Sequence, residues 1–317
     1  MVSADFNTRI DAIGIARSPD EYRVIQSSNS IHSLKNVEAS ILNSVTREKF
    51  TVSGRCLICG ANVSFCVDQK SGGKRRGSQF LPNWRERMVC PLCGMNNRQR
   101  LIATLVRQEL NSKVGKNVYF MEQVTPLFSW AAKNFKGNQI VGSEYLGAKY
   151  DGGASIRNGL RALKLFCRFR FFEAVKIGFT GIRHENIEVL SFPNNSLDLI
   201  VSNDVFEHVP NYLQGFQECC RVLRTGGVMI VAIPFHAERK ESVCRASLIN
   251  GKFQYIHPPT FHGNPVSKDG SLVFTDFGWD LIKEIKMQGF SDAYMSSFAA
   301  PEYGHLGNNL DILFCIK

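Results

Sequence analysis

The sequence lacks a long apolar run: none approaches the roughly 18 residues that a membrane-spanning helix needs, so we expect no such span. An apolar leader is missing too, because the first segment, MVSADFNTRIDAIGIARS, has no continuous apolar core; we therefore expect a cytoplasmic chain. The 317 residues are 44% hydrophobic and 21% charged. This composition excludes a disordered chain, a coiled coil and a collagen-like fibre, and it favours one large domain or two unequal ones.

Acidic residues are outnumbered, with 28 Asp and Glu against 38 Lys and Arg, which gives a formal net charge of +10. Such an excess suits an anionic partner, whether nucleic acid, anionic lipid or a phosphorylated substrate. Cysteine, by contrast, is plentiful, with ten residues. Because we find no export signal, disulfides are disfavoured, and metal binding or plain burial is the better interpretation of these cysteines.

Four of the cysteines repeat a Cys-x-x-Cys-Gly pattern, first at Cys56 and Cys59 and again at Cys90 and Cys93. Two thiolates at this spacing can reach one tetrahedral ion, and the glycine behind each pair allows a sharp turn. Four sulfur ligands favour Zn²⁺ and leave no open position, so the pattern predicts a structural zinc. The alternative is four buried thiols. We interpret Cys66 as a strand residue and not as a fifth ligand.

Beyond residue 116 the chain alternates short apolar runs with amphipathic stretches. The expected strands are residues 117–122, 139–145, 187–190, 197–203 and 228–234, with a closing hairpin at 292–298 and 311–316. The expected helices are 126–135, 212–223 and 276–288. This order predicts an α/β fold with a Rossmann-like, doubly wound, mostly parallel seven-stranded sheet and a small N-terminal zinc-binding module. The predicted domains are a polar, helical segment at 1–49, the zinc module at 50–96 and the α/β domain at 97–317, with a lid-like substrate segment at 236–275.

One block, SFPNNSLDLIVSNDVFEHVPNYLQGFQECCRVLRTGGVMIVAIPF, resembles the central part of class I S-adenosylmethionine-dependent methyltransferases of the type 11 kind. The later stretch HPPTFHGNPVSKDGSLVFTDFGWDLIKEIKMQGF is similar to a bacterial branch associated with polysaccharide or natural-product biosynthesis. Members of that branch also carry a cysteine module ending in a CPLCGMNNRQR-like sequence. The resemblance covers roughly residues 50–317. It implies S-adenosylmethionine as cofactor and a small-molecule or glycan acceptor, including a lipid-linked one, methylated on a hydroxyl or amine.

Polar residues end the predicted strands, at the edge where a doubly wound sheet binds its ligand. Glu144, after the second strand, can accept hydrogen bonds from both hydroxyls of a ribose. The resemblance implies that Glu122 lies near the amino-acid part of the cofactor and Asn186 near the adenine amine. The predicted cofactor-binding set is Glu122, Gln123, Thr125, Glu144, Tyr145, Asn186, Ile187 and Asn203.

The first loop departs from the family, because EQVTP at residues 122–126 replaces a glycine-rich E-x-G-x-G-x-G. Without these glycines the backbone cannot approach a ligand as closely. Thr125 can still cap, and Pro126 can still open, the helix that follows. The N-terminus of that helix could then hold the methionine part of the cofactor through its carboxylate.

Three candidate catalytic residues, Asp204, Glu207 and His208, follow the fourth predicted strand. Histidine titrates near neutral pH, so His208 is the predicted base for a hydroxyl acceptor. The acid-x-x-Glu-His spacing is similar to a divalent-metal site in quinone-pathway O-methyltransferases, which implies a divalent cation held by these three residues. The alternative is that Glu207 and His208 only begin a helix or pack beneath it. His262, in a segment rich in proline and glycine, faces the acceptor in one hypothesis and is a solvated loop residue in the other.

Two basic segments leave alternatives open. Residues 155–179 predict an amphipathic helix with a basic flank, which either packs on its own domain or docks on an anionic membrane. A second cluster lies in the zinc loop and consists of Lys74, Arg75, Arg76, Arg85 and Arg87. This cluster supports RNA as an alternative partner. The main hypothesis is thus a zinc-stabilised methyltransferase of small molecules or glycans, and the alternatives are an RNA methyltransferase and a non-catalytic binding protein.

Overall fold

The computed structural model divides the chain into two compact units. The N-terminal unit comprises Met1–Ser112 and Tyr294–Leu313, and the central unit comprises Lys113–Ala293 and Phe314–Lys317. The structure describes residues 8–45, 47–76, 79–147, 181–264, 266, 269–307 and 310–317. The predicted basic helix at 155–179 lies outside the described residues.

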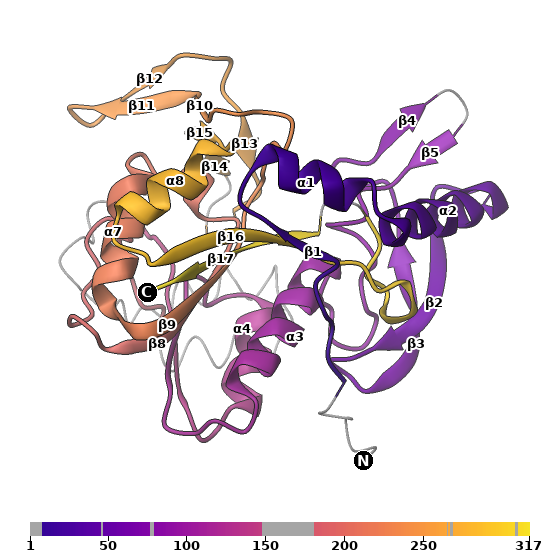
Figure 1. Cartoon of the computed structure of the whole chain (residues 1–317), viewed down its shortest axis with the longest axis horizontal. Helices are drawn as coiled ribbons and strands as arrows, with labels where there is room; N and C mark the ends of the chain where they lie inside the picture. The colour runs from indigo at the N-terminus through magenta and orange to yellow at the C-terminus, as the bar shows by residue number, and fades with distance from the viewer. Residues whose placement is uncertain are drawn as a thin grey trace. The chain divides into compact units, whose positions relative to one another are not determined.

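Seven strands form a mixed sheet in the order β1-β16-β17-β9-β8-β6-β7 (Figure 1). Their bounds are Gly14–Ala16 (β1), Asn117–Phe120 (β6), Gln139–Gly142 (β7), Leu197–Asn203 (β8), Leu223–Ala232 (β9), Asp292–Ser297 (β16) and Asp311–Ile316 (β17). The prediction of a Rossmann-like α/β fold with a seven-stranded sheet is confirmed. One member differs from the prediction, because β1 was not expected and pairs antiparallel with β16.

Four parallel strands, β7, β6, β8 and β9, form the sheet of the central unit. They are short apolar runs, and Val118, Tyr119 and Phe120 of β6 are fully buried, as expected for parallel strands covered on both faces. The helices of this unit are α4 (Pro126–Asn134), α7 (Tyr212–Val222) and α8 (Asp280–Met287). Because the strands are parallel, the residues that follow β6, β7 and β8 gather at one edge of the sheet.

The strand expected at residues 187–190 does not form. Instead, His184 makes a single parallel bridge to Glu144, and Asn186 bridges to Val189. The reason is local: the Asn186 Oδ1 accepts a hydrogen bond of 3.0 Å from the backbone N–H of Glu188, which turns the chain. The pairing beside β7 therefore falls earlier in the sequence than predicted.

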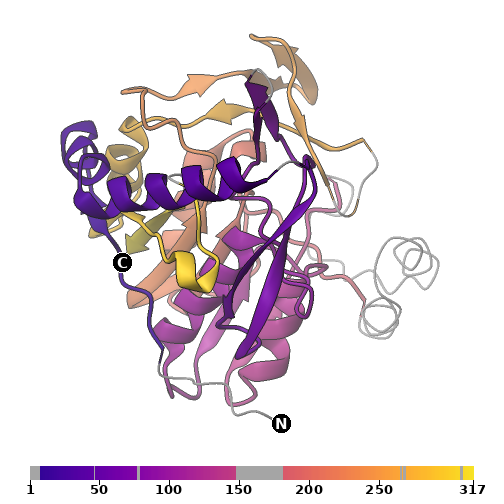
Figure 2. The same cartoon turned by 90° about the vertical axis from the view of Figure 1, so that its right-hand side faces the viewer.

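Two helices, two hairpins and a third helix make up most of the N-terminal unit. Their bounds are Pro19–Gln26 (α1), Asn29–Ser44 (α2), Phe50–Cys56 (β2), Ala61–Val67 (β3), Lys74–Arg76 (β4), Gln79–Leu81 (β5) and Asn97–Leu110 (α3). Figure 2 shows the β2–β3 hairpin along its length. One buried cluster consists of Ile31, Leu34, Cys56, Phe65, Val67, Trp84, Met88, Cys90 and Leu306. The cysteine module thus packs into a core that α2 and Leu306 complete.

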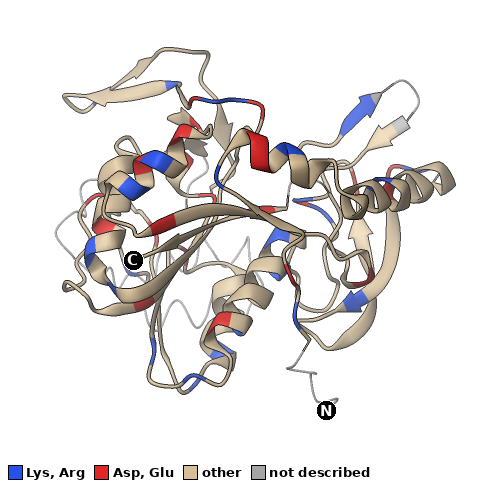
Figure 3. Cartoon of the chain, viewed as in Figure 1, with Lys and Arg blue, Asp and Glu red and all other residues tan. Residues whose placement is uncertain are grey.

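The segment predicted as a lid contains three short antiparallel ribbons. They are β10–β15 (Val243–Cys244 and Thr275–Asp276), β11–β12 (Ala246–Ile249 and Lys252–Tyr255) and β13–β14 (Phe261–His262 and Ser271–Leu272). The β11–β12 hairpin turns at Asn250 and Gly251, whose φ values of 51° and 73° suit a tight hairpin turn. Little charge lies on this hairpin (Figure 3).

Within the described residues, no helix is both long enough and apolar enough to cross a bilayer.

Candidate functional sites

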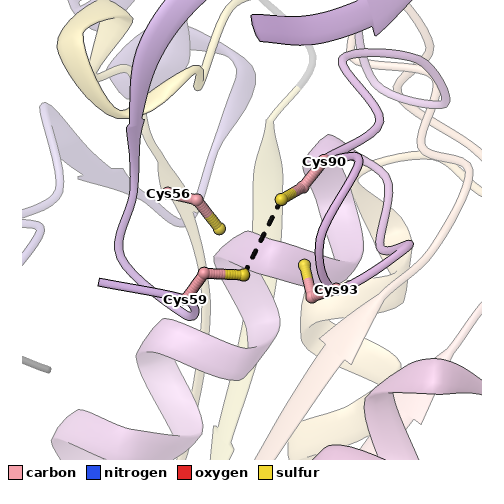
Figure 4. A group of neighbouring side chains, drawn as sticks. All are labelled: Cys56, Cys59, Cys90 and Cys93. Atoms are coloured by element: carbon pink, nitrogen blue, oxygen red, sulfur yellow. Dashed lines mark hydrogen bonds between the residues drawn. The ribbon is translucent and has the colours of Figure 1, made fainter. Parts of the chain in front are cut away.

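The four cysteines of the repeated pattern come together in the N-terminal unit, with their sulfurs all within 4.8 Å of one another. Their side chains point toward one another (Figure 4), and the sulfurs of Cys59 and Cys90 are 3.7 Å apart. A tetrahedral Zn²⁺ with bonds of about 2.3 Å would hold its sulfurs about 3.8 Å apart. The cluster therefore fits such an ion.

The two Cys-x-x-Cys-Gly segments each form a backbone turn of the same type. The N–H groups of Gly60 and Gly94 donate to the carbonyls of Cys56 and Cys90, at 2.8 and 2.9 Å. The two glycines have φ values of 67° and 73°, in the left-handed region that favours glycine, as the sequence pattern predicts. Cys66 lies in β3 and outside the cluster, which confirms its interpretation as a strand residue.

Two arginines of α3 lie beside the cysteines and were not predicted. Arg100 is 1% exposed and donates to the carbonyls of Met88, Tyr303 and Gly304 at 2.7–3.2 Å. Burial lowers the pKa of its guanidinium, and the nearby cysteines oppose this shift. Arg107 donates to the carbonyl of Leu57, the residue after Cys56, at 2.9 Å. Their spacing of two helical turns is the pattern by which the sequence could have placed them on one face.

Three arginines of the basic cluster in the zinc loop form ion pairs within the N-terminal unit. The pairs are Arg75 with Glu48, Arg85 with Glu86, and Arg87 with Asp68. This pairing reduces the positive charge that the loop can offer to a phosphate backbone. RNA as an alternative partner stays a prediction.

Glu144, the predicted ribose ligand, lies just after β7 and binds the first loop. Its Oε1 accepts hydrogen bonds from the backbone N–H groups of Gln123 and Val124, at 2.8 and 3.0 Å. Burial raises the pKa of Glu144 to about 7, although the two backbone hydrogen bonds lower it. The loop without glycines is thus tied to the carboxylate. The second carboxylate oxygen, Oε2, takes no part in these two bonds.

The remaining residues of the first loop also lie at this edge. Gln123 connects the loop to the neighbouring segment, since its side chain donates to the carbonyl of Gly181 and accepts from the N–H of Arg183. Thr125 accepts a hydrogen bond from the N–H of Phe128 and caps α4, as predicted. Glu122 is 6% exposed, and the side-chain amide of Asn203 lies 3.5 Å from its Oε2.

Three more residues of the predicted cofactor-binding set, Tyr145, Asn186 and Ile187, lie beside the single bridge between Glu144 and His184. Ile187 is buried, whereas Tyr145 is 54% exposed and stacks at a tilt on His184, with ring centres 5.4 Å apart. The His184 Nδ1 accepts from the N–H of Leu146 at 3.0 Å. The Asn186 amide oxygen is used in its local turn. An apolar side chain and an aromatic ring thus lie close to Glu144 in the chain and at the bridge.

Glu207, His208 and His262 form the second group with metal-ligand spacing among the described residues, with one ligand atom from each within 4.8 Å of the others. Glu207 and His208 belong to a short 3₁₀ helix, Phe206–His208, that follows β8. His262 comes from β13, more than 50 residues later, and lies opposite Ser271 of β14. The His208 Nδ1 lies 2.8 Å from the carbonyl oxygen of Leu272 on the same ribbon. The β13–β14 ribbon therefore brings the two histidines together.

Asp204 directly follows β8, as the sequence predicts. Its N–H donates to the carbonyl of Ala232 at 2.9 Å, which extends the pairing of β8 with β9. Its φ of 53° then turns the chain out of the strand, a conformation that aspartate tolerates better than most residues. Asp204 is not a member of the group with metal-ligand spacing, where His262 stands in its place.

Comparison with known proteins finds similarity over one part of the chain. Residues 167–231 match the methyltransferase domain family Methyltransf_11. A relative from Mycolicibacterium smegmatis, named as a probable S-adenosylmethionine-dependent methyltransferase, is 45% identical over 53 residues. That match covers 17% of this chain and about a fifth (21%) of the relative's length.

Two solved structures are similar in fold at low identity. An S-adenosylmethionine-dependent methyltransferase from Mesorhizobium loti is 16% identical, with a TM-score of 0.40 over 69% of this chain and 98% of that chain. A 1,6-didemethyltoxoflavin-N1-methyltransferase from Burkholderia thailandensis is 12% identical, with a TM-score of 0.36 over 69% of this chain and 76% of that chain.

Proposed function

We propose that the chain is an S-adenosylmethionine-dependent methyltransferase that methylates a hydroxyl or amine of a small-molecule or glycan acceptor. The observation that carries the proposal is the arrangement at one edge of one parallel sheet. Glu144 follows β7 there, and Glu207 and His208 follow β8, where His262 of β13 joins them. The matched family segment supports it, because residues 167–231 include β8, Glu207, His208 and nearly all of β9.

The cofactor end of the site consists of Glu144, the first loop and α4. When bound, the cofactor supplies an electrophilic methyl group on a sulfonium. Glu144 Oε2 suits the ribose hydroxyls, while Oε1 keeps the N–H groups of Gln123 and Val124 in place. The N-terminus of α4, capped by Thr125, suits the cofactor's carboxylate. We therefore expect one carboxylate to hold both the loop and the ribose.

The acceptor end of the site is the cluster of Glu207, His208 and His262. In the reaction the acceptor O–H or N–H bond breaks, a bond from that atom to the methyl carbon forms, and the sulfur–methyl bond breaks. The products are the methylated acceptor, S-adenosylhomocysteine and a proton. A carboxylate and two imidazoles beside the acceptor can promote loss of that proton. We propose that Glu207, His208 and His262 do so.

The four cysteines, in this proposal, hold one structural Zn²⁺. Sulfur spacing and the two matched turns support it, and so does the buried guanidinium of Arg100, which interacts electrostatically with all four cysteines. Measuring the zinc content of the purified chain tests this, with Cys93→Ser as the comparison. One zinc per chain is expected for the wild type.

Binding of the cofactor tests the main proposal. Calorimetry with S-adenosylmethionine and S-adenosylhomocysteine should give micromolar dissociation constants for the wild type. Glu144→Ala should weaken binding by at least about tenfold, because charge-assisted hydrogen bonds to the ribose are lost. Glu241→Gln, at an exposed glutamate of the same unit, is the matched control and should bind normally. No binding by a folded, zinc-loaded wild type would overturn the proposal and favour a non-catalytic protein.

A further inference from the structure

We propose that Glu207, His208 and His262 bind one divalent transition-metal ion, of the series from Mn²⁺ to Zn²⁺, at a site separate from the four cysteines. The site itself follows from contacts within the central unit. Only the role of the ion, in handling the acceptor, rests on the proposed function.

The spacing of the three side chains fits a shared ion better than direct hydrogen bonds. The Glu207 Oε1 lies 3.5 Å from the His208 Nε2 and 3.5 Å from the His262 Nδ1. These distances exceed the usual 2.7–3.2 Å of an N–H···O hydrogen bond. Ligands bound at about 2.1 Å lie about 3.4 Å apart around a tetrahedral ion. The rings of the two histidines are nearly perpendicular, at 89°, with their centres 5.0 Å apart.

The buried carboxylate of Glu207 is the second observation that points to a ligand. Its side chain is 1% exposed, and neither of its oxygens accepts a hydrogen bond within the described part of the chain. A buried carboxylate without such partners is costly, because it loses its hydration without replacement. The backbone of Glu207 is also held in place, since its carbonyl accepts a hydrogen bond of 2.7 Å from the N–H of Phe274. A bound cation would satisfy both oxygens.

The orientation of His208 is that of a metal ligand. Its Nδ1 lies 2.8 Å from the carbonyl oxygen of Leu272, so Nδ1 carries the proton and donates. This leaves the lone pair on Nε2, the nitrogen that faces Glu207. Metal-binding histidines are held in the same way, by donation from the other ring nitrogen to a carbonyl or carboxylate.

The third side chain, His262, leaves the site open to a substrate. Its side chain is 40% exposed, whereas the side chain of His208 is 16% exposed. The ribbon that carries His262 is held by the side-chain amide of Asn264, which donates to the Ser271 hydroxyl at 2.9 Å. Three protein ligands on one side leave further positions of an ion for water or an acceptor oxygen.

The ligand set selects the class of ion. Two imidazoles and one carboxylate suit the divalent ions of the first transition row, whereas Ca²⁺ and Mg²⁺ prefer oxygen ligands alone. An acceptor hydroxyl that binds such an ion loses its proton more readily, because the ion stabilises the oxyanion. The chain would then not need a free His208 as base.

Titration with Mn²⁺ alone, followed by calorimetry and by the electron paramagnetic resonance of the free ion, tests the site in the full chain. Mn²⁺ prefers oxygen and nitrogen ligands to thiolates, so zinc at the cysteines stays in place. We expect one Mn²⁺ per wild-type chain. His262→Ala and Glu207→Gln should each weaken binding by about 100-fold or more. His257→Ala, at an exposed histidine five residues before His262, should bind as the wild type does.

Two results would overturn the site: no Mn²⁺ binding by the wild type, or equal binding by Glu207→Gln. Glu207→Gln keeps the shape of the side chain, and unchanged circular dichroism and zinc content would show that it folds. Parallel calorimetry with S-adenosylmethionine separates the two proposals. Metal binding without cofactor binding supports the site and contradicts the proposed function. Cofactor binding without metal binding contradicts the site and leaves His208 as a free base.

Discussion

Replacing Glu144 by glutamine should remove a pH dependence from the stability of the chain. Burial raises the pKa of this carboxyl from its ordinary 4.5 to about 7 in the folded state. The folded chain therefore holds a proton over a pH range in which the unfolded chain has released it. Stability that is present below about pH 4.5 is lost as the pH rises to about 7. Since one pKa unit corresponds to 1.36 kcal/mol and the side chain keeps some contact with solvent, the loss is roughly 2–3 kcal/mol.

The assay is urea-induced unfolding of the wild type and Glu144→Gln between about pH 5 and about pH 8. The glutamine keeps an oxygen that can accept from the N–H groups of Gln123 and Val124, so the loop should stay in place. The difference in unfolding free energy between the two proteins isolates Glu144 from other groups, including Asp311, whose pKa burial raises to about 6. If the difference stays constant over this range, the reasoning about Glu144 is wrong. Cofactor binding by the wild type should strengthen as the pH rises through about 7, because the ionised carboxylate is the better acceptor.

Three further predictions concern the two clusters of potential ligands. Cys93→Ser should lower the zinc content, measured by atomic absorption, well below one per chain. It should also lower the melting temperature of the N-terminal unit, measured by calorimetry. An unchanged zinc content would contradict the site. Arg100→Lys keeps the charge, but a lysine cannot reach three carbonyls at once. We therefore expect it to destabilise the N-terminal unit by about 2–3 kcal/mol in urea unfolding. An unchanged free energy of unfolding would refute the structural role of Arg100. Glu207→Gln should stabilise the metal-free chain by about 1–2 kcal/mol in urea unfolding, because it removes a buried carboxylate that has no hydrogen-bond partners among the described residues. A loss of stability would indicate a partner that neutralises Glu207.

Local sequence patterns were sufficient to predict those strands and helix ends that depend on residues close together in the chain. β8 and β17 have the predicted bounds, because each contains a short run of apolar residues, as buried strands do. Thr125 and Pro126 begin α4 as expected, because capping needs only residues within one helical turn. The prediction of a strand at residues 187–190 was wrong, and the cause is also local. There the side chain of Asn186 makes a turn that competes with extended pairing, and hydrophobic pattern alone does not detect it.

The sequence by itself determined that two Cys-x-x-Cys-Gly turns would be alike, because each turn depends on its own five residues and on a glycine that tolerates positive φ. It also identified Glu207 and His208 as neighbours in the chain. Only the tertiary structure decided that His262 joins them in place of Asp204, because the β13–β14 ribbon must first pair before the two histidines can meet. The same holds for Arg100, whose partners include residues more than 200 positions away. Contacts between distant segments depend on the packing of the whole unit, which no local pattern records.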